Sequence, residues 1–503
     1  MNPSAIQPTP ENDRVTKAAG VVGSATLLSR IFGFIRDVVI AGYFGAGLSS
    51  DAFFVAFRIP NLMRRLFAEG SLSVSFIPVF TEYLSNQGKD DAFELARSAI
   101  RLLSILLVAT TIAGIFLSPV IIRVIAPGFA GSPEKLSVTI FLTRIMFPYI
   151  FFIGMVALSM GILNVLGHFA APALAPVLLN ISIIGSAFLI SPHMSDPVVG
   201  LAIGVLIGGF LQLVLQIPFL AKKGFLFWEK AKVYHPGLKK IGLLMLPTIF
   251  GSAVYQVNIL VGTLLASLLA EGSVSYLYYA DRLVQFPLGI FAIATATAVL
   301  PSLSRQAAKR DLPAVRDTFS YAMRLVFFIT IPSMVGLIVL REPIVALLFK
   351  RGAFDAETTR LTAYALLYYA VGLWAFSAVR IVVSTFYSLQ DTRTPVRATS
   401  LASMLNLALL IQALKVKIGA LELRSITRSA CKTMVCSTIM GVVVWAVALL
   451  IIPSENETFL ALFFGIMGSI VTGIILYGAF SLLLKSQELN HLLAIAKKGI
   501  GKK

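Results

Sequence analysis

The sequence predicts an all-α membrane protein with about thirteen membrane-spanning segments. Of its 503 residues, 57% are hydrophobic and only 13% are charged, whereas soluble domains carry roughly 25% charged residues. Apolar runs long enough to cross a bilayer recur from one end of the chain to the other. Transmembrane β-barrels alternate polar and apolar residues and lack such runs, so helices are expected.

Thirteen candidate spans follow one another with short connections, which leave no separate soluble domain. They cover residues 16–44, 52–83, 96–124, 137–165, 171–190, 198–221, 240–268, 274–302, 318–340, 360–388, 398–414, 431–452 and 459–484. Residues 1–15 precede them as a cytoplasmic tail, because Arg30 and Arg36 interrupt what would be the apolar core of a cleavable signal peptide. Residues 485–503 are expected to form a second cytoplasmic tail.

Basic loops set the predicted orientation. Residues 222–239 and 303–316 are rich in Lys and Arg, and such loops lie on the cytoplasmic side. Two spans separate them, so both can be cytoplasmic, and counting back places the N-terminus there as well. The segment 341–360 is an exception, since its basic residues would lie outside. The net charge of +18 is thus explained by topology, and no nucleic-acid partner is expected.

Neither a metal site nor an enzymatic active site is expected. The two cysteines, Cys431 and Cys436, lie in or beside a late span, and the four histidines are scattered, so no zinc site or disulfide framework is indicated. The chain has no GxxxxGKS/T phosphate loop, no HExxH motif and no GxSxG motif. We expect a non-enzymatic protein without a cofactor, in which any transport is coupled to the membrane potential or to a monovalent ion, or else is driven by the substrate gradient alone.

Two halves of the chain repeat one pattern at a nearly constant offset. Arg58 and Arg282, in the related segments AFRIP and ADRL, are 224 positions apart (282 − 58). Pro78 and Pro301, in FIP and VLP, are 223 positions apart (301 − 78). Six spans separate the copies, an even number, so both halves have the same orientation.

The repeat predicts two parallel six-helix lobes around a central cavity, where a binding site is expected. The predicted parts are an N-lobe (16–221), a basic loop (222–239), a C-lobe (240–417) and two C-terminal helices (431–484). The second copy is shorter at its end, because Asn406 reaches Lys415 almost at once. In the first copy, a loop and a further span separate Asn180 from Lys222. About 30 residues, close to one helix and a loop, are missing.

The shortened region affects the predicted topology. Basic residues flank the segment 398–414 on both sides, so both flanks should be cytoplasmic. We therefore expect that this segment does not cross the membrane as an ordinary span, which leaves twelve true crossings. In the alternative, it crosses and the last two helices are inverted.

Charged residues inside the first span are candidates for a binding site. An arginine at the centre of a span costs about 2.5–3.5 kcal/mol on insertion scales, so it usually faces a bundle interior or a water-filled cavity. Arg30 and Arg36 are six positions apart, roughly 240° around a helix, and can border one cavity from two angles. For Arg36 a second interpretation stays open, in which Arg36 and Asp37 lie harmlessly at the interface.

The second span is a candidate binding and gating element. Its polar residues are Asp51, Arg58, Arg64, Arg65 and Glu69. Pro60 removes a backbone donor and Gly70 weakens the helix, so a kink is expected. Arginine suits phosphate because the planar guanidinium makes bidentate contacts. In the alternative, Arg64 and Arg65 form a cytoplasmic basic cluster that only sets topology.

The eighth span carries the matching polar residues of the second half. Asp281 and Arg282 lie among tyrosines and aliphatic residues, and Arg58 is the repeat counterpart of Arg282. A purely structural Asp281–Arg282 pair is the alternative. With arginines from both lobes facing inward, the cavity would be cationic, which favours an anionic, amphiphilic ligand over a cationic drug.

Five motifs carry a family resemblance: SRIFGFIRD, DAFFVAFRIPNLMRRLFAEGSLSVSFIPVF, APGF, APALAPVLLNIS and YYADRLVQFPLGI. They resemble the MurJ (MviN) family of lipid II flippases, in the multidrug/oligosaccharidyl-lipid/polysaccharide exporter superfamily, over about residues 15–400. The resemblance implies a monomer in the bacterial inner membrane that flips lipid II to the periplasmic leaflet by alternating access, with cell-wall synthesis machinery as a further partner. The family has fourteen spans, one more than the segments counted here.

The resemblance also implies roles for single residues. The family's substrate-binding arginines fall on Arg30, Arg36, Arg64 and Arg282, with Arg65 adjacent. Its key acids fall on Asp51 and Glu69, and Gln285 stands where relatives often have Glu. With Arg58 and Asp281, chosen from the residues themselves, these are the expected gating and structural polar residues. Asp51 should tune closure at the outer end and not bind substrate, because it would repel an anionic headgroup. The alternative functions are a multidrug/cation antiporter, a flippase for another lipid-linked oligosaccharide, and a scaffold that binds the lipid without moving it.

Overall fold

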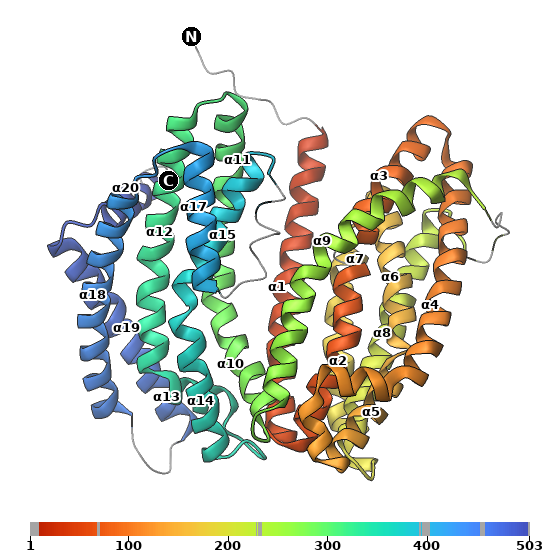
Figure 1. Cartoon of the computed structure of the whole chain (residues 1–503), viewed down its shortest axis with the longest axis horizontal. Coiled ribbons are helices and arrows are strands. Elements are labelled where there is room, and N and C mark those ends of the chain that lie inside the picture. Colours follow the sequence, from red (N-terminus) through yellow and green to blue (C-terminus); the bar gives the residue numbers. More distant parts are fainter. Residues whose placement is uncertain are drawn as a thin grey trace. The chain divides into compact units, whose positions relative to one another are not determined.

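The computed structural model describes residues 10–67, 71–227, 229, 234–391, 394, 403–452 and 458–500. In these ranges all regular secondary structure is helical (Figure 1). Eight helical stretches of the described residues are long and apolar enough to cross a membrane. A ninth is added if the pair Ala356–Val371 and Leu373–Ser388, bent by 41°, is one span. The predicted class, an all-α multi-span membrane protein, is confirmed. The number of thirteen segments stays a prediction.

The chain divides into two compact units, Met1–Ser275 and Tyr276–Lys503. Unit 1 contains α1 (Pro10–Phe44), α2 (Leu48–Phe67), α3 (Ser71–Asn86), α4 (Lys89–Ile125), η1 (Pro127–Gly131), α5 (Pro133–Met146), α6 (Tyr149–Val165), α7 (Ala170–Leu189), η2 (Ser191–His193), α8 (Val198–Lys222) and α9 (Pro236–Ser267). The first residues of α10 (Ser273–Pro287) also belong to it. Unit 2 continues with η3 (Leu288–Ile293), α11 (Ala294–Ala308), α12 (Leu312–Val339), α13 (Arg341–Phe349), α14 (Ala356–Val371), α15 (Leu373–Ser388), α17 (Ser403–Ile418), α18 (Leu423–Ile451), α19 (Phe459–Leu483) and α20 (Gln487–Ile500).

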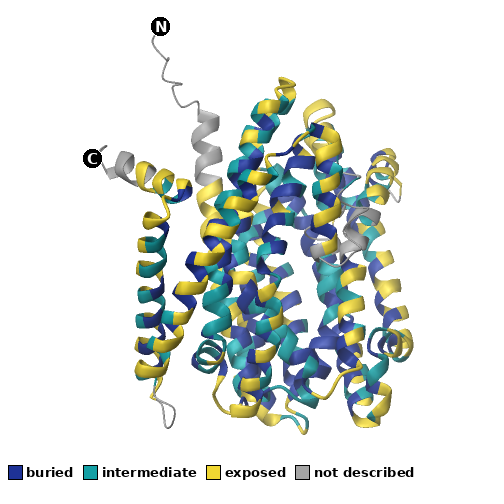
Figure 2. Cartoon of the chain, turned by 60° about the vertical axis from the view of Figure 1, so that its left-hand side comes forward, coloured by how far each residue is buried: buried dark blue, intermediate teal, exposed yellow. Residues whose placement is uncertain are grey.

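Small residues allow α7 and α8 of unit 1 to pack closely. A Cβ atom at Gly204 would lie 2.7 Å from Ser186, and one at Gly208 would lie 2.8 Å from Leu179. Close backbone approach through such residues is the usual way in which membrane helices associate, because lipid offers no hydrophobic driving force between them. Figure 2 shows buried and exposed residues as separate stripes along many of the helices. The exposed stripes are apolar, as expected for helices that face lipid.

A proline inside α12 explains a contact between α12 and α19 in unit 2. Pro332 lies inside α12 and has no N–H, so the carbonyl of Phe328, four residues earlier, lacks its helical donor. The hydroxyl of Tyr477 in α19 donates to this carbonyl at 2.7 Å, and the two rings lie 5.1 Å apart. Tyr477 thereby satisfies a carbonyl that lipid could not and holds α19 against α12.

The exceptional basic segment 341–360 contains α13 and the turn before α14. Arg341 donates to the carbonyl of Ile338 at the end of α12 (2.7 Å), and Arg351 donates to the carbonyl of Leu348 (2.8 Å). Both arginines therefore bind the last, unpaired carbonyls of helices, where the negative end of the helix dipole favours a cation. Local helix capping accounts for these two charges, apart from any role in topology.

The helix bounds reproduce the repeat offset. The starts of α4 and α12 are 223 positions apart (312 − 89), and so are those of α5 and α14 (356 − 133). The N-caps agree: Ser132 accepts from the backbone N–H of Lys135, and Asp355 accepts from that of Thr358. The second and eighth spans also correspond, since α2 and α3 match α10 and α11, with the π-helical turn η3 between the latter two.

The repeat breaks off where the sequence predicted it. In unit 1 the end of α8 lies beside the turn between α6 and α7, because the ring of Phe219 stacks on that of His168 at 4.5 Å. In unit 2 the end of α17 lies beside the end of α15, because Lys417 pairs with Asp391 at 2.7 Å. His168 and Asp391 are 223 positions apart (391 − 168), so α17 takes the place of α8. Only residues 389–402 separate α15 from α17, too few for a helix of the length of α7.

The same ion pair bears on the predicted topology. Asp391 precedes the segment 398–414 and Lys417 follows it, and their contact places both flanks at one end of unit 2. This contact agrees with an even number of crossings between these flanks, which stays a prediction.

The unit boundary differs from the boundary of the predicted lobes, which stay a prediction. The span 240–268, predicted to open the C-lobe, is α9 and belongs to unit 1. Lys240 pairs with Glu82 at 2.6 Å, and Gly237 lies against Leu95 of α4. The repeat gives a physical reason. Its counterpart α1 packs along α7, whereas the second copy is too short to supply an equivalent of α7 for α9.

Candidate functional site

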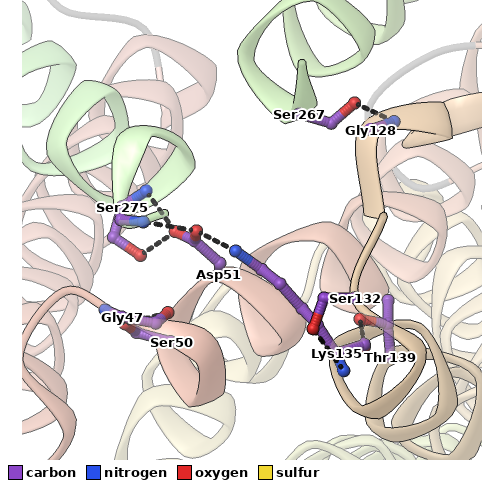
Figure 3. Close-up of polar contacts among 10 residues, drawn as sticks. Gly47, Ser50, Asp51, Gly128, Ser132, Lys135, Thr139, Ser267 and Ser275 are labelled. Carbon is purple, nitrogen blue, oxygen red and sulfur yellow. Dashed lines mark hydrogen bonds and ion pairs between the residues drawn. The ribbon is translucent and has the colours of Figure 1, made fainter. Parts of the chain in front are cut away.

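The carboxylate of Asp51 is the centre of a buried polar cluster in unit 1 (Figure 3). Asp51 lies in the first turn of α2 and is 1% exposed. Its Oδ1 accepts from the backbone N–H of Ser275 (2.9 Å) and from the Ser275 hydroxyl (2.6 Å). Its Oδ2 accepts from Lys135 Nζ (2.6 Å) and from the backbone N–H of Gly272 (2.9 Å). Four donors therefore surround one buried carboxylate.

Three of these donors lie at the start of α10, namely the backbone N–H groups of Gly272 and Ser275 and the hydroxyl of Ser275. The first N–H groups of a helix have no partner within the helix, and the positive end of the helix dipole favours an anion. Asp51 supplies both an acceptor and a negative charge there, from a residue more than 200 positions earlier in the chain. Gly272 adopts φ 87°, a backbone conformation that favours glycine. Asp51 thus caps α10 and fixes the turn that leads into it.

Lys135 balances the charge of Asp51. It lies in the first turn of α5 and is 5% exposed, and its ammonium lies 4.5 Å from the centre of the Phe129 ring. A buried ion pair is costly to break by removing one partner, because the other charge is then left buried and unpaired, a loss of about 3–5 kcal/mol. We call Asp51, Lys135, Gly272 and Ser275 the Asp51 latch.

A second contact holds the end of α9 beside the Asp51 latch. The backbone N–H of Gly128 in η1 donates to the hydroxyl of Ser267 at 3.3 Å. A Cβ atom at position 128 would lie 1.9 Å from the carbonyl oxygen of Ser267, so only glycine fits. By the predicted topology, the start of α2 and the end of α9 both lie at the outer end of their helices. The latch and this contact together fasten the α9–α10 turn at that end of unit 1.

Arg36 is buried and bound within unit 1. Its guanidinium donates to Asp37 Oδ1 (2.6 Å from Nη2) and to Asn180 Oδ1 of α7 (3.0 Å from Nη1). Asn180 in turn donates to the carbonyl of Ser29 at 3.2 Å. Arg36 is 7% exposed and Asp37 is 1% exposed. Arg36 and Asp37 thus neutralise each other between α1 and α7. This differs from the expected arrangement in which Arg36 borders a cavity.

The other predicted residues of unit 1 lie on α1 and α2. Arg30 is exposed on α1, one turn and a half before Arg36. Arg64 is half-buried, and its Nε and Nη2 donate to Asn61 Oδ1 at 3.2 and 3.1 Å. Arg58 and Arg65 are also half-buried on α2. Glu69 lies outside the described residues.

Unit 2 contains the predicted residues of the eighth span. Arg282 donates to the hydroxyl of Tyr278 at 2.9 Å, and its guanidinium lies 5.1 Å from the centre of that ring. Asp281 accepts from the amide of Gln285. These residues lie on α10, whose first turn Asp51 caps. Sequence reasoning missed Lys135 and Ser275. Ser275 could have been found from the repeat, because it is the counterpart of Asp51, whereas Lys135 gave no signal in an otherwise mixed segment.

Comparisons with known proteins agree on one family. The model of the family described as "Lipid II flippase MurJ" matches residues 40–423. The "Probable lipid II flippase MurJ" of Vibrio cholerae is 42% identical over 403 residues, which cover 79% of this chain and 77% of the relative. The "Lipid II flippase MurJ" of Burkholderia cenocepacia is 37% identical over 385 residues, covering 76% of this chain and 75% of the relative.

Solved structures show the same fold. The structure titled "Lipid II flippase MurJ, inward closed conformation" has a TM-score of 0.75 and 28% identity, and the match covers 92% of this chain and 98% of that one. An inward-facing transporter of the multidrug resistance MATE family has a TM-score of 0.59 at 17% identity, with 93% of this chain and 99% of that one covered. At that identity the second likeness concerns the fold alone.

Proposed function

Because this chain belongs to the lipid II flippase MurJ family, we propose that it moves lipid II, the undecaprenyl-pyrophosphate-linked precursor of peptidoglycan, from the cytoplasmic to the periplasmic leaflet of the bacterial inner membrane. The observation that carries the proposal is the family match over residues 40–423, which includes the Asp51 latch, Arg64 and Arg282. The protein is a transporter, and no covalent chemistry is required of its residues.

The arginines fit the headgroup of such a lipid. A pyrophosphate offers several oxygens that a planar guanidinium can bind in pairs. Arg30 is exposed, Arg64 is half-buried and donates to Asn61, and Arg282 donates to the hydroxyl of Tyr278. We assign these three residues to the headgroup, with Arg65 adjacent. Arg36, bound to Asp37 and Asn180, serves better to orient α1 against α7.

The Asp51 latch fits the gating half of an alternating-access cycle. Three of its four hydrogen bonds hold the start of α10 at the predicted outer end, and the fourth joins Asp51 to Lys135 of α5. Outward opening of this turn would require Asp51 to release these donors, at a cost that the bound substrate must offset. The latch therefore supports a protein that rests closed at the outer end until the headgroup is bound. The solved MurJ structure is titled as an inward closed conformation.

Without another energy source, transport would depend on the membrane potential or on a monovalent ion. Moving one elementary charge across the membrane is worth about 2.3 kcal/mol per 100 mV. The headgroup is anionic and the cytoplasm is negative, so the potential favours outward movement of the unneutralised headgroup. We therefore propose coupling to the potential, with a coupled ion as the alternative.

Complementation tests the proposal directly. This chain, expressed in a bacterium depleted of its own lipid II flippase, should restore growth and normal shape, and should prevent lipid II from accumulating in the inner leaflet. A chain that restores neither, although it reaches the membrane at normal levels, is not a lipid II flippase in that host. A chain that binds lipid II without relieving its accumulation would act as a scaffold. Protection against cationic drugs, without rescue, would instead identify an antiporter.

A further inference from the structure

Equivalent positions of the two repeat copies carry opposite chemistry at the predicted cytoplasmic end. In unit 2, Asp391 binds Lys417 of α17 at 2.7 Å and accepts from the backbone N–H of Thr394 at 3.0 Å. The Lys417 ammonium, followed by that N–H, holds the pKa of Asp391 well below its usual range. The lysine at the end of α17 is thus neutralised by a carboxylate of the same unit.

In unit 1 a histidine occupies the place of that carboxylate. His168, 223 positions before Asp391 (391 − 168), stacks on Phe219 of α8 at 4.5 Å. Two lysines, Lys222 and Lys223, follow at the end of α8, and Lys222 Nζ lies 5.8 Å from the centre of the Phe219 ring. The helix ends correspond, but the charge does not. An imidazole at this position cannot neutralise a lysine as Asp391 does.

The electrostatics at His168 show an excess of positive charge. Partial burial, and then the charges of Lys223 and Lys222, lower the pKa of His168 below its ordinary value. The imidazole is therefore neutral near pH 7 and does not offset the positive charge of the two lysines. Its Nε2 is a buried atom that has no hydrogen-bond partner among the described residues. A buried polar atom of this kind needs an explanation, and a water molecule or an ion bound beside it is one.

Lys89 adds a third ammonium to the same end of unit 1. Its Nζ lies 3.1 Å from the position that a Cβ on Gly224 would take. Gly224 directly follows the two lysines of α8 and adopts φ 84°. Three acidic residues of this end are already engaged with other bases. The pairs are Glu82 with Lys240, Asp91 with His235, and Glu229 with Arg97.

We propose that Lys89, His168, Lys222 and Lys223 form a binding site for a phosphate group that supplies the negative charge which Asp391 supplies in unit 2. Clusters of basic residues at the cytoplasmic ends of membrane helices bind the headgroups of anionic lipids. The same oxyanion chemistry also admits free phosphate. The site lies on unit 1 alone, and it stands whether or not the proposed transport function does.

Lipid retention by the full-length protein tests the site. The protein is purified into nanodiscs of phosphatidylcholine with a minor fraction of phosphatidylglycerol, and the co-purified phosphatidylglycerol is measured by native mass spectrometry. His168→Asp places a carboxylate in the position that Asp391 holds and keeps all three lysines. We expect it to lower phosphatidylglycerol retention about fivefold, as for the loss of one lysine, and we expect Lys222→Gln with Lys223→Gln to lower it further, by about fivefold per lysine. Equal retention by wild type and both variants would overturn the proposal.

A matched control removes two charges elsewhere on the same unit. Lys239→Gln with Lys240→Gln should retain phosphatidylglycerol within twofold of wild type, and an equal loss there would reduce the effect to net charge and overturn a defined site. If His168→Asp does not fold, as judged by thermal unfolding, the two double variants decide. Inorganic phosphate in discs of phosphatidylcholine alone distinguishes the sources. Protection of Lys222 and Lys223 from an amine-reactive reagent by phosphate identifies the free anion as a ligand, and protection by phosphatidylglycerol alone identifies the lipid headgroup.

Discussion

Asp51 and Ser275 are 224 positions apart (275 − 51), the offset of the internal repeat, and are joined by two hydrogen bonds of 2.9 and 2.6 Å. The first turns of two equivalent helices, α2 and α10, therefore meet at a single carboxylate. Only the first copy carries the acid, and the second presents the donors. The two equivalent positions of the repeat thus contact each other, because the first copy has an aspartate where the second has a serine.

Asp51→Asn should weaken the Asp51 latch, because the amide loses the charge that Lys135 and the start of α10 require. Thr139, one turn beyond Lys135 and fully buried, is a suitable reporter. In a chain with Cys431 and Cys436 replaced by serine, Thr139→Cys should react with a membrane-impermeant maleimide several times faster when Asp51→Asn is present.

The double variant Asp51→Asn with Lys135→Met provides the control. It removes both buried charges, so labelling should return toward the rate of the parent chain. Unchanged labelling in Asp51→Asn, together with weaker binding of lipid II, would show that Asp51 contacts the substrate and is not a latch.

Arg64→Ala and Arg282→Ala should abolish complementation of a flippase-depleted strain while protein levels stay near normal. Arg→Lys at either position should rescue only partly, because lysine keeps the charge but loses the planar pair of donors. Growth curves and immunoblots of membrane fractions check both statements. Full growth with either alanine variant would rule out its assignment to the headgroup.

Arg30, Arg64 and Arg282 are predicted to face one water-accessible cavity. Cysteines at the three positions should each react with a small charged reagent that does not enter lipid, and lipid II should slow all three reactions together. Two unreactive positions would contradict the prediction, because an arginine held in lipid offers no route for such a reagent.

Tyr477→Phe should lower the stability of unit 2, because the carbonyl of Phe328 loses its donor at a position where Pro332 provides none. The expected loss is about 1–3 kcal/mol, seen as a lower midpoint of thermal unfolding in detergent. Tyr368→Phe is the matched control, since Tyr368 is 78% exposed. Equal midpoints for the two variants would show that the hydroxyl of Tyr477 contributes nothing.

Reporter fusions should place the residues that follow α17 and the last loop on opposite sides of the membrane. A fusion after Lys417 should report a cytoplasmic position, in agreement with the Asp391–Lys417 pair. A fusion within residues 454–457, which contain no Lys or Arg, should report an external one. The reverse pair of signals would mean that α18 and α19 are inverted.

Much of this arrangement could be predicted from the sequence because it depends on local composition. The cost of burying charge in lipid acts on each segment separately, so apolar runs reveal the spans and isolated arginines reveal candidate binding residues. The repeat offset is likewise a property of the linear chain. It predicted the correspondence of α4 with α12, which the helix bounds reproduce, and a shortened second copy, in which only residues 389–402 separate α15 from α17.

Only the tertiary structure shows which charged side chains are exposed and which are bound to other residues of the chain. Arg30 and Arg36 look alike in the sequence, yet Arg36 is neutralised by Asp37 and donates a hydrogen bond to Asn180, 144 positions away, whereas Arg30 is exposed. The partner of Asp51 is Lys135, 84 positions on, in a helix with no distinctive motif. Hydropathy and spacing carry no information on such pairs, because a buried ion pair depends on which helix faces pack together, and packing is a property of the folded chain.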